Sequence, residues 1–444
     1  MIKKLFTLCL LLASLPSLAQ VLAGPMLGYS EMREVMLWVQ TEKAAVVKYN
    51  YWVKGGDGSK MSTTPIMTRK NNYFIAKGIA DDVLPGNVYE YELILNGVKQ
   101  QFDYPLEFQS QTLWQYRTDP PAFSFAVGSC VYTNQPEFDR PGKGYGNSFA
   151  VFDEIYKKKP NFMVWGGDNI YLREVDFGTR SGIFKRYIDF KKQPELQRLF
   201  ANTHHYATLD DHDFGPNDSD RSYWGKSWAL DAFEENWGNP NYIFPGESVT
   251  GTFNWEDVQF FIMDDRSFRA PNWYRDTDKD YFGEKQLSWL IDALASSRAP
   301  FKFVVTGGQV VNPNVLFENM STFPDERQKL LDEIERHNIS GVMFITGDRH
   351  HTSMRKLERE GTYPLYDLTV SSLTSGMAKP RDAERTSPDL VEGTIVEDLQ
   401  NFGLMEISGP RTDRVLKINI IDNTGAPRWD YTIKARDLRK PRTE

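Results

Sequence analysis

The sequence predicts an α/β protein in which an N-terminal β-sandwich, residues 24–115, precedes a larger α/β domain, residues 122–444. Residues 29–110 contain short aromatic and β-branched runs separated by turn residues, which is the pattern of antiparallel strands with one solvated face. From residue 123 onward, near-continuous apolar runs alternate with amphipathic helical segments, which indicates strands covered on both faces. The segment "YRTDPP" between the two regions has the composition of a linker.

The bulk composition indicates a globular protein. Of the 444 residues, 40% are hydrophobic, 14% aromatic and 25% charged, which suits large cores and excludes a disordered or fibrous chain. The formal net charge of −8 argues against an anionic membrane or nucleic acid as a general partner, so we expect no stable nucleic-acid complex. A local cationic pocket remains compatible with this charge.

The first residues have the layout of a secretory signal peptide, residues 1–19. Lys3 and Lys4 precede an apolar run, and "SLA" ends the segment with a small-x-small cleavage site. A second possible site follows Ala23, and a short buried helix is the alternative interpretation. We therefore expect a periplasmic or secreted protein. No later run reaches about 18 uninterrupted apolar residues, so we expect no transmembrane segment after signal cleavage.

Export makes the two cysteines informative. Cys9 leaves with the signal peptide, so Cys130 remains as a single thiol that cannot form an internal disulfide. A lone cysteine of this kind is either a small buried hydrophobe or a functional group, and the residues around it indicate which of the two roles it has.

The N-terminal region reads as strands in "EVMLWVQ", "AVVKYNYWVKG", "NYFIAKGI" and "VYEYELILNG". The phrase "VLPGNVYEYEL" resembles the fibronectin type III pattern, in which an apolar-x-Pro-Gly corner precedes Tyr-x-Tyr. Val83, Pro85, Tyr89 and Tyr91 occupy those positions. The resemblance implies a fibronectin-III-like sandwich.

The larger region contains six buried strands: "FSFAVGSC", "NFMVWGGDNIY", "HHYATLDDHD", "VQFFIMDDRSF", "FKFVVTGGQVV" and "GVMFITGDRHH". Helices are expected in "SFAVFDEIYKKK" and "PDERQKLLDEIERHN", whose apolar residues share one helical face. "YPLYDLTVSSLTSG", "FGLMEISG" and "RVLKINIID" follow without helices between them, which predicts a second sheet.

Polar residues follow all six buried strands. In open α/β sheets, ligand crevices form at the carboxyl ends of strands, so six such ends with carboxylates, imidazoles and a thiol predict one polynuclear metal site. His204 and His205 begin their strand and are expected to be structural, and His351 should point away from His350 because neighbours on a strand alternate faces. The strand ends are Ser129–Cys130, Gly167–Asp168, Asp210–Asp211–His212, Asp264–Asp265–Arg266, Gly308–Gln309 and Gly347–Asp348–Arg349–His350.

Taken in order, "SC", "GDNIY", "DDHDFGPN", "DDRSFR", "GDRHH" and "NFG" resemble the motif series of PhoD-like alkaline phosphatases and phosphodiesterases, within the calcineurin-like metallophosphoesterase superfamily. The resemblance covers nearly the whole mature chain. It implies a four-layer α/β/β/α catalytic domain that hydrolyses small phosphomonoesters, phosphodiesters or both. The reaction it implies is in-line attack by a metal-activated hydroxide.

The resemblance also implies the ligands. Asp168 would bridge two metals, and Cys130, Tyr171 and His350 would complete an iron site. A thiolate with a phenolate favours ferric iron over magnesium or calcium on chemical grounds as well. A neighbouring calcium would take the all-oxygen ligands that this ion requires. Those oxygen ligands are Asp211 and Asp348, with Asp210 and Asn217 nearby, and the division among Asp210, Asp211, Asp213 and Asn217 stays open.

His212 is not needed as a ligand in this scheme. By resemblance it hydrogen-bonds a phosphoryl oxygen or protonates the leaving alkoxide. Arg266 and Arg269 are candidates for holding the negative substrate through bidentate contacts. The alternative for these arginines is an ordinary salt bridge with Asp264 or Asp265.

Other interpretations remain open. A non-enzymatic calcium-binding surface protein explains the aspartates but leaves Cys130, Tyr171 and His350 without a reason. A thiol hydrolase using Cys130 would keep its activity after metal removal. The predicted signal is an ordinary secretory one, whereas better-known members of the family carry a twin-arginine signal, so we expect any iron to be acquired outside the cytoplasm. The aromatic residues of segment 224–244 either pack a helix on the sheet or form a wall for a leaving group.

Overall fold

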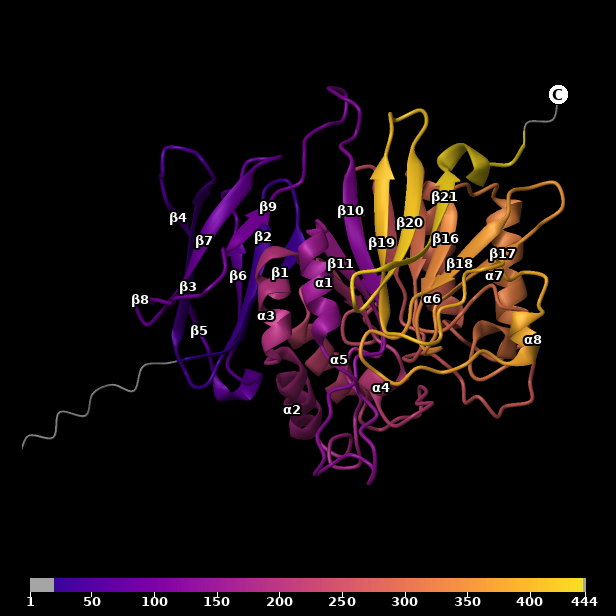
Figure 1. Ribbon diagram of the computed structural model, residues 1–444, viewed down its shortest axis with the longest axis horizontal. Helices are drawn as coiled ribbons and strands as arrows, with labels where there is room; N and C mark the ends of the chain where they lie inside the picture. Colours follow the sequence, from indigo (N-terminus) through magenta and orange to yellow (C-terminus); the bar gives the residue numbers. More distant parts are fainter. Residues whose placement is uncertain (1–19, 442–444) are drawn as a thin grey trace, which may run out of the picture.

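The computed structural model describes residues 20–441 and shows a mixed α/β protein built on three β-sheets (Figure 1). This confirms the predicted class. The predicted signal peptide, including Cys9, lies outside the described residues. Within residues 20–441, no helix combines the length and the apolar character needed to cross a membrane.

The first sheet contains nine strands and includes three of the six predicted buried strands. β10, β11 and β12 run parallel in its centre, and every residue of β11 and β12 is buried, as the continuous apolar runs predict. In spatial order its strands are β21 (Pro427–Lys434), β20 (Val415–Asp422), β19 (Asn401–Ser408), β10 (Phe123–Gly128), β11 (Phe162–Gly166), β12 (His204–Thr208), β1 (Val21–Ser30), β2 (Val35–Thr41) and β6 (Ile75–Ala80).

The second sheet contains six strands and includes the other three predicted buried strands. β14, β15, β16 and β18 are parallel, and the two edge strands are antiparallel to their neighbours. In spatial order its strands are β13 (Gly251–Trp255), β14 (Val258–Ile262), β15 (Lys302–Val305), β16 (Val342–Thr346), β18 (Leu365–Thr369) and β17 (Ser353–Leu357).

The late strands do not form a sheet of their own, which corrects one expectation. β18 joins the six-stranded sheet, whereas β19 and β20 extend the nine-stranded sheet beside β10. Local pattern predicts that these segments are strands, but the partner of each strand depends on contacts with residues far away in the chain.

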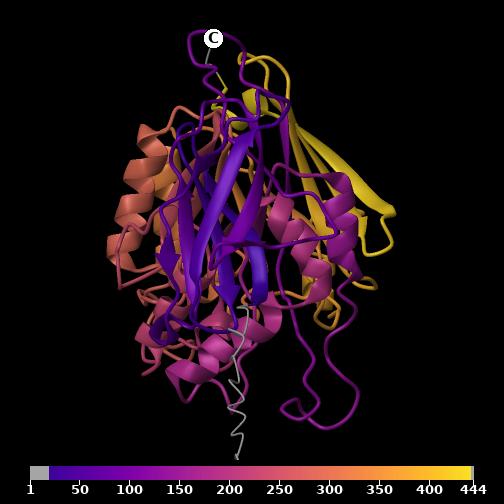
Figure 2. The same ribbon diagram turned by 90° about the vertical axis from the view of Figure 1, so that its left-hand side faces the viewer.

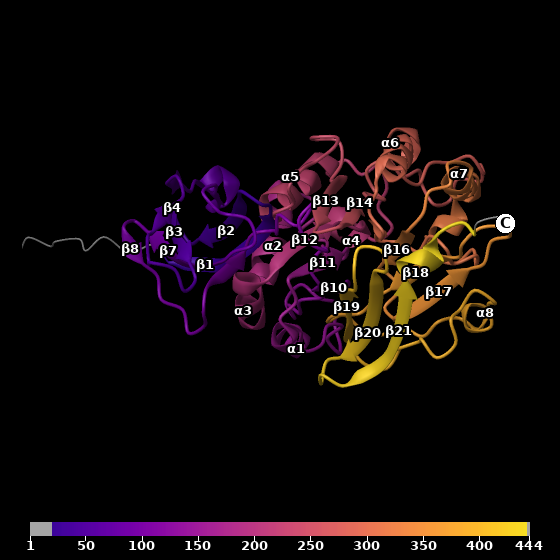
Figure 3. The ribbon, with the colours of Figure 1, turned by 90° about the horizontal axis from the view of Figure 1, so that it is seen from above.

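The two large sheets pack face to face through aromatic side chains. The Phe125 ring lies 5.2 Å from Phe260 and 5.5 Å from Phe303 of the opposite sheet, measured between centroids. Trp165, on the other face of β11, packs on Phe152 of α1 (Ala150–Lys158) and Phe200 of α3 (Pro194–Asn202), two helices that lie beside this sheet in Figure 3. Helices α6 and α7 cover the outer face of the six-stranded sheet. The helices are α1 (Ala150–Lys158), α2 (Arg180–Lys191), α3 (Pro194–Asn202), α4 (Asp211–Phe214), α5 (Lys226–Asn236), α6 (Gly283–Ser296), α7 (Pro324–Arg336) and α8 (Asp382–Arg385), with short 3₁₀ turns η1 (Lys70–Asn72), η2 (Met320–Thr322) and η3 (Ala435–Leu438).

The N-terminal region forms two packed sheets, but one of them is shared with the larger region. β1 lies parallel to β12, with Leu27 opposite His204, and β2 and β6 continue the nine-stranded sheet outward. This arrangement covers the edge of β12, whose backbone groups would otherwise be unpaired. The third sheet packs on these strands and consists of β4 (Met61–Ser62), β3 (Val46–Val53), β7 (Val88–Leu95) and β8 (Val98–Lys99), with β5 (Ile66–Met67) on β3 and β9 (Glu107–Gln109) on β7.

Candidate metal centre

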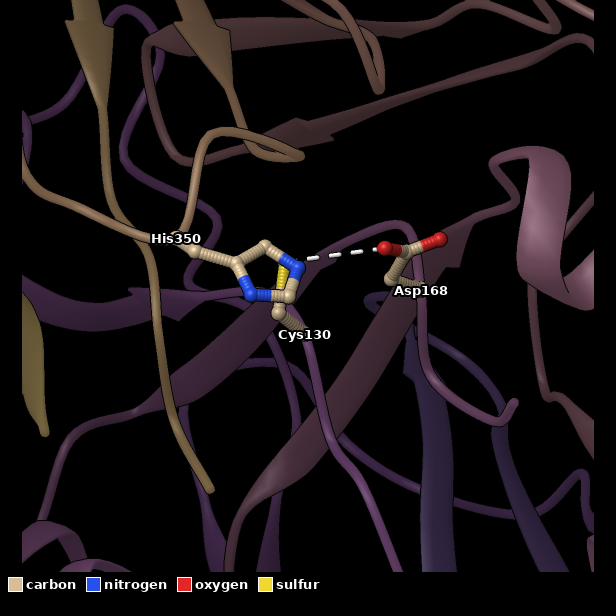
Figure 4. A group of neighbouring side chains, drawn as sticks. All are labelled: Cys130, Asp168 and His350. Atoms are coloured by element: carbon tan, nitrogen blue, oxygen red, sulfur yellow. Dashed lines mark hydrogen bonds between the residues drawn. The ribbon is translucent and has the colours of Figure 1, made fainter. Parts of the chain in front are cut away.

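Three predicted ligands meet where β10, β11 and β16 end. Ligand atoms of Cys130, Asp168 and His350 lie within 4.8 Å of one another (Figure 4). The Cys130 thiol lies 3.6 Å from Asp168 Oδ2, the contact that the dashed line marks. The structure therefore brings together side chains that are up to 220 residues apart in the sequence.

The backbone at these strand ends adopts a sparsely populated conformation. Cys130, Asp168, Asp348 and His350 have φ values of 62°, 52°, 61° and 54°, in the left-handed region that side-chain-bearing residues rarely occupy. Gly167, before Asp168, has a φ of 90°, and a Cβ there would lie 2.7 Å from the Cβ of Asp210. Strain of this kind concentrates at functional sites, where the surrounding structure holds it.

Tyr171 completes the first group of donors. Its hydroxyl donates to Asp168 Oδ2 at 2.9 Å and lies 3.0 Å from His350 Nε2. On the other side of the imidazole, Nδ1 lies 2.8 Å from the Gly376 carbonyl oxygen, so an Nδ1–H donor leaves Nε2 free as a ligand. Burial raises the pKa of the Cys130 thiol to about 11, and a nearby cation is the agent that reverses such a shift.

A second group of donors consists of carboxylates. Asp168 forms one cluster with Asp210 and Asp348, and another with Asp211 and His212. Asp168 thus belongs to both donor groups, which is the position required of a bridging ligand. Burial, with repulsion from Glu318, raises the pKa of Asp348 to about 6.

Two oxygens of this second group have no hydrogen-bond donor among the described residues. Asp210 Oδ2 and Asp211 Oδ1 are both buried without a partner. An unpaired buried carboxylate oxygen is costly, and a bound cation removes that cost. The donor chemistry of both groups and these orphaned oxygens fit metal ions.

Asp213 is a structural residue of this loop. Its carboxylate accepts hydrogen bonds from the backbone N–H groups of Asn169 at 3.1 Å, Ile170 at 3.3 Å and Asp210 at 3.0 Å. It thereby fixes the segment after Asp168 against the segment that begins with Asp210. Burial raises its pKa to about 7 despite these hydrogen bonds.

Arg266 is fully buried behind the carboxylates. Its Nε donates to Asp210 Oδ1 at 2.7 Å, and its two terminal nitrogens donate to Glu318 at 2.8 and 2.9 Å. Asp265 lies 3.3 Å away, whereas Asp264 accepts from the backbone of Arg266. Arg266 therefore forms salt bridges within the protein, which is the alternative to a direct contact with substrate, and it holds Asp210 in place.

Arg269 is buried in the same layer. It donates to Asn272 and to the Glu318 carbonyl oxygen and lies over the rings of Tyr281 and Phe323. Its guanidinium is thus held by protein groups.

His212 lies at the boundary between the donors and a cavity of about 560 Å³. Its ring packs on Tyr171 at a centroid distance of 4.2 Å, and its Nε2 is 3.9 Å from Asp211 Oδ2. Burial lowers the pKa of His212, and a neutral imidazole still donates one hydrogen bond. Asn217 is exposed and lines the same cavity.

Two residues beside the centre were not predicted from the sequence. Glu318 clusters with Asp210 and Asp211, and although burial alone would raise its pKa, Arg266 and Arg269 lower it to about 2. Glu318 lies well beyond the end of β15 in "NPNVLFENM", which carries no local signal. Tyr145 donates or accepts at His350 Nδ1 over 2.7 Å, and the signal that could have found it is an isolated aromatic in "GKGYGNS".

Other predicted positions lie outside the centre. His204 Nδ1 is 2.8 Å from the Gly28 carbonyl oxygen, and His205 accepts from the Trp165 indole at 3.0 Å, so both have structural partners. Gln309 donates to Thr369 instead of to the site. His351 is buried away from the donors, on the side of Glu384.

The aromatic segment 224–244 contributes both packing and exposed residues. Phe233 and Trp237 are buried in the core beneath α5, which fits helix packing. Trp224 is 66% exposed.

The family model described as PhoD-like phosphatase matches residues 125–413. The solved structure titled "Structure of PhoD" matches with a TM-score of 0.74 at 15% identity and covers 92% of this chain and 91% of its own, which shows the fold. Comparison with curated proteins gives no match. A Vps29 mutant from Entamoeba histolytica matches with a TM-score of only 0.25, at 10% identity and over 70% of this chain and 98% of its own.

Proposed function

The chain belongs to the PhoD-like phosphatase family, and from this premise we propose that it is an exported, metal-dependent phosphoesterase acting on small phosphomonoesters, phosphodiesters or both. Family membership implies a hydrolase of phosphoric ester bonds that depends on metal ions. Export rests on the signal-peptide pattern of residues 1–19.

One observation carries the proposal: two groups of metal-type donors share Asp168 at the carboxyl ends of the strands. The group with Cys130, Tyr171 and His350 suits ferric iron, because it combines a thiol, a phenol and an imidazole. The carboxylates of Asp210, Asp211 and Asp348 suit calcium. Asn217 is proposed as a further oxygen ligand, since it lies in the loop that follows Asp211.

The residues of the chain have separate tasks in this proposal. When bound, the metal ions would polarise the phosphoryl group and lower the pKa of the attacking water. His212, on the cavity side of Tyr171, donates a hydrogen bond to a phosphoryl oxygen or a proton to the leaving alkoxide. Arg266 acts one layer below, where it fixes Asp210 and Glu318. It is a positioning residue.

The test combines elemental analysis with activity assays on one monoester and one diester. We expect metal in the purified protein, hydrolysis at neutral to alkaline pH, loss of hydrolysis on chelation and at least partial recovery with calcium. Hydrolysis that survives complete metal removal would refute the metal-dependent mechanism and favour a thiol hydrolase. A correctly loaded protein that hydrolyses neither ester would favour the non-enzymatic calcium-binding alternative.

A further inference from the structure

One loop contributes nearly half of the residues that line the cavity beside His212. The loop consists of residues 132–149 and connects β10 to α1. In Figure 2 it is the long purple loop that extends to the bottom of the picture. Asn134 closes its base, since its side chain donates to the Gly146 carbonyl oxygen at 2.8 Å and accepts from the Gly146 N–H at 2.9 Å. A loop closed in this way is a compact unit of the kind that often carries specificity.

The first half of the loop is fixed rigidly. Asp139 accepts from the Tyr132 hydroxyl at 3.0 Å, from Arg173 Nη2 at 2.8 Å and from the Gln135 N–H at 2.6 Å. Gln135 in turn donates to Asp189 of α2 at 2.6 Å. This half therefore presents its side chains in a preorganised arrangement, which lowers the entropic cost of binding a ligand.

The fixed half contributes aromatic rings to the cavity. Tyr132 lies 5.1 Å from Tyr171 and 5.0 Å from Tyr145, measured between ring centroids, and Tyr171 packs on His212. Phe138 lines the same cavity. The candidate general acid and these tyrosines thus form a series of ring contacts at the cavity, Phe138 adds a further ring to its lining, and flat ligands stack on aromatic rings.

The middle of the loop, residues 140–143, contributes positive charge. Arg140 and Lys143 both line the cavity and are exposed, and no ion pair of either is found among residues 20–441. Arg173, by contrast, is neutralised by Asp139. The lining also contains the exposed carboxylate of Glu174, so the two cations leave a small positive excess, which favours an anionic ligand in a chain with a formal charge of −8.

We propose that this cavity binds the leaving group of a nucleotide that carries a second phosphate, with the base on the aromatic rings and the second phosphate at Arg140 and Lys143. The inference rests on the proposed function and names its substrate class. A lipid tail would use the rings but leave both cations without a partner. A plain sugar phosphate would use neither the rings nor the charges.

The experiment compares substrates with the same leaving oxygen. Adenosine 5′-monophosphate and ribose 5-phosphate share a primary alkoxide and differ in the base. Adenosine 3′,5′-bisphosphate adds only the second phosphate. We expect kcat/KM to rise roughly 5- to 150-fold from ribose 5-phosphate to the monophosphate, the range for stacking one base on aromatic side chains. For hydrolysis of the 5′-phosphate, we expect kcat/KM to be about tenfold higher with the bisphosphate than with the monophosphate, and this difference should be smaller at high salt.

Variants assign each gain to its residues. Phe138→Ala should reduce the ratio of monophosphate to ribose 5-phosphate towards 1, and the double variant Arg140→Gln/Lys143→Gln should reduce the ratio of bisphosphate to monophosphate. Lys70→Gln, at an exposed cation outside the cavity, is the matched control and should leave both ratios unchanged. Circular dichroism and metal content establish that each variant is folded and loaded.

Two results would overturn the inference while leaving the proposed function intact. One is equal kcat/KM for adenosine 5′-monophosphate and ribose 5-phosphate. The other is a preference for a long-chain alkyl phosphate over both, which would assign the cavity to lipid tails. Failure to hydrolyse any of these esters or a simple diester would instead refute the proposed function, and the inference with it.

Discussion

Among single residues, Cys130 separates the competing interpretations most clearly. Its sulfur lies 3.0 Å from the Ser371 hydroxyl and 3.4 Å from that of Ser129, and burial keeps the pKa of the thiol at about 11. Without a cation the thiol is therefore protonated at neutral pH. A ferric ion would convert it to a thiolate, and ligand-to-metal charge transfer from the thiolate and Tyr171 would colour the protein.

Cys130→Ser should bleach or shift the visible absorption and lower the iron content per chain, because an alcohol is a harder and less acidic ligand than a thiol. The measurements are the visible spectrum and elemental analysis of wild type and variant. A cysteine that only packs would tolerate serine at a cost of about 1 kcal/mol, with the metal unchanged. A colourless, iron-free and fully active wild type would end the thiolate–iron assignment but not that of a two-metal esterase.

His212→Ala should lower kcat by about 100- to 10,000-fold, the usual cost of removing a general acid, while metal content and fold stay unchanged. The reason is that its ring packs on Tyr171 and lines the cavity, although it also lies close enough to Asp168 and Asp211 to be tested as a ligand. His337→Ala is the matched control, since this imidazole is exposed at the end of α7 beside Glu333. Loss of metal from His212→Ala would reassign the residue as a ligand.

At the level of elements, His204 connects three strands. Its Nδ1 faces the Gly28 carbonyl oxygen of β1 at 2.8 Å, and its Nε2 accepts from the Gln109 N–H of β9 at 3.4 Å. This pattern requires the neutral imidazole, with Nδ1–H as the donor. Burial lowers the pKa of His204 to about 4.

The contribution of His204 to the free energy of unfolding should therefore fall as the pH decreases from about 6.5 to 4, because in this window the unfolded chain binds a proton at His204 that the folded chain excludes. This contribution is fully present above about pH 6.5. Below that pH one such histidine lowers the free energy of unfolding by about 1.4 kcal/mol per pH unit, and by about 3 kcal/mol in total. Urea unfolding followed by tryptophan fluorescence between pH 4 and 7 measures this slope. His204→Gln should make the slope smaller by the share of one histidine, whereas His337→Gln should leave it unchanged. Equal slopes in wild type and His204→Gln would contradict the assignment.

The six buried strands and their polar ends were predictable because both signals are local. A run such as "NFMVWGGDNIY" contains the strand and the ligand that follows it, and parallel strands place such ends on one side of a sheet. The placement of Glu318 was not predictable. Its position depends on ion pairs with Arg266 and Arg269, and the loop that carries it has no sequence motif that indicates a site. The role of Asp213 was hidden for a similar reason, since its partners are backbone N–H groups that exist only in the folded loop.

For the whole molecule, the shared sheet means that the N-terminal region is part of the same folded unit as the larger region. The sequence predicted a sandwich joined by a linker, and Tyr116 in that linker is fully exposed. Nevertheless β1, β2 and β6 belong to the same nine-stranded sheet as the ligand-bearing strands. The likeness of the sandwich to fibronectin type III remains a prediction from sequence.

Removal of residues 20–115 should prevent stable folding of the remainder, because it uncovers the edge of β12 and the buried faces that β1 and β2 cover. We expect an aggregating fragment and, for the complete chain, a single calorimetric unfolding transition. Shortening the exposed turn 55–58 is the control and should change neither result. A soluble, metal-binding fragment that spans residues 116–441 would show that the larger region folds on its own.

The pairing of β1 with β12 also sets the order in which the molecule can be completed. Gly28 and His204, which contact each other across these strands, are 176 residues apart in the chain. At synthesis rates of 5 to 20 residues per second, β1 must wait roughly 9 to 35 s before its neighbour exists. His350 is made later still, so the set of donors becomes complete only after β12 exists. High contact order of this kind makes folding slow, because β1 cannot pair with β12 until the 176 residues that separate Gly28 from His204 have been made.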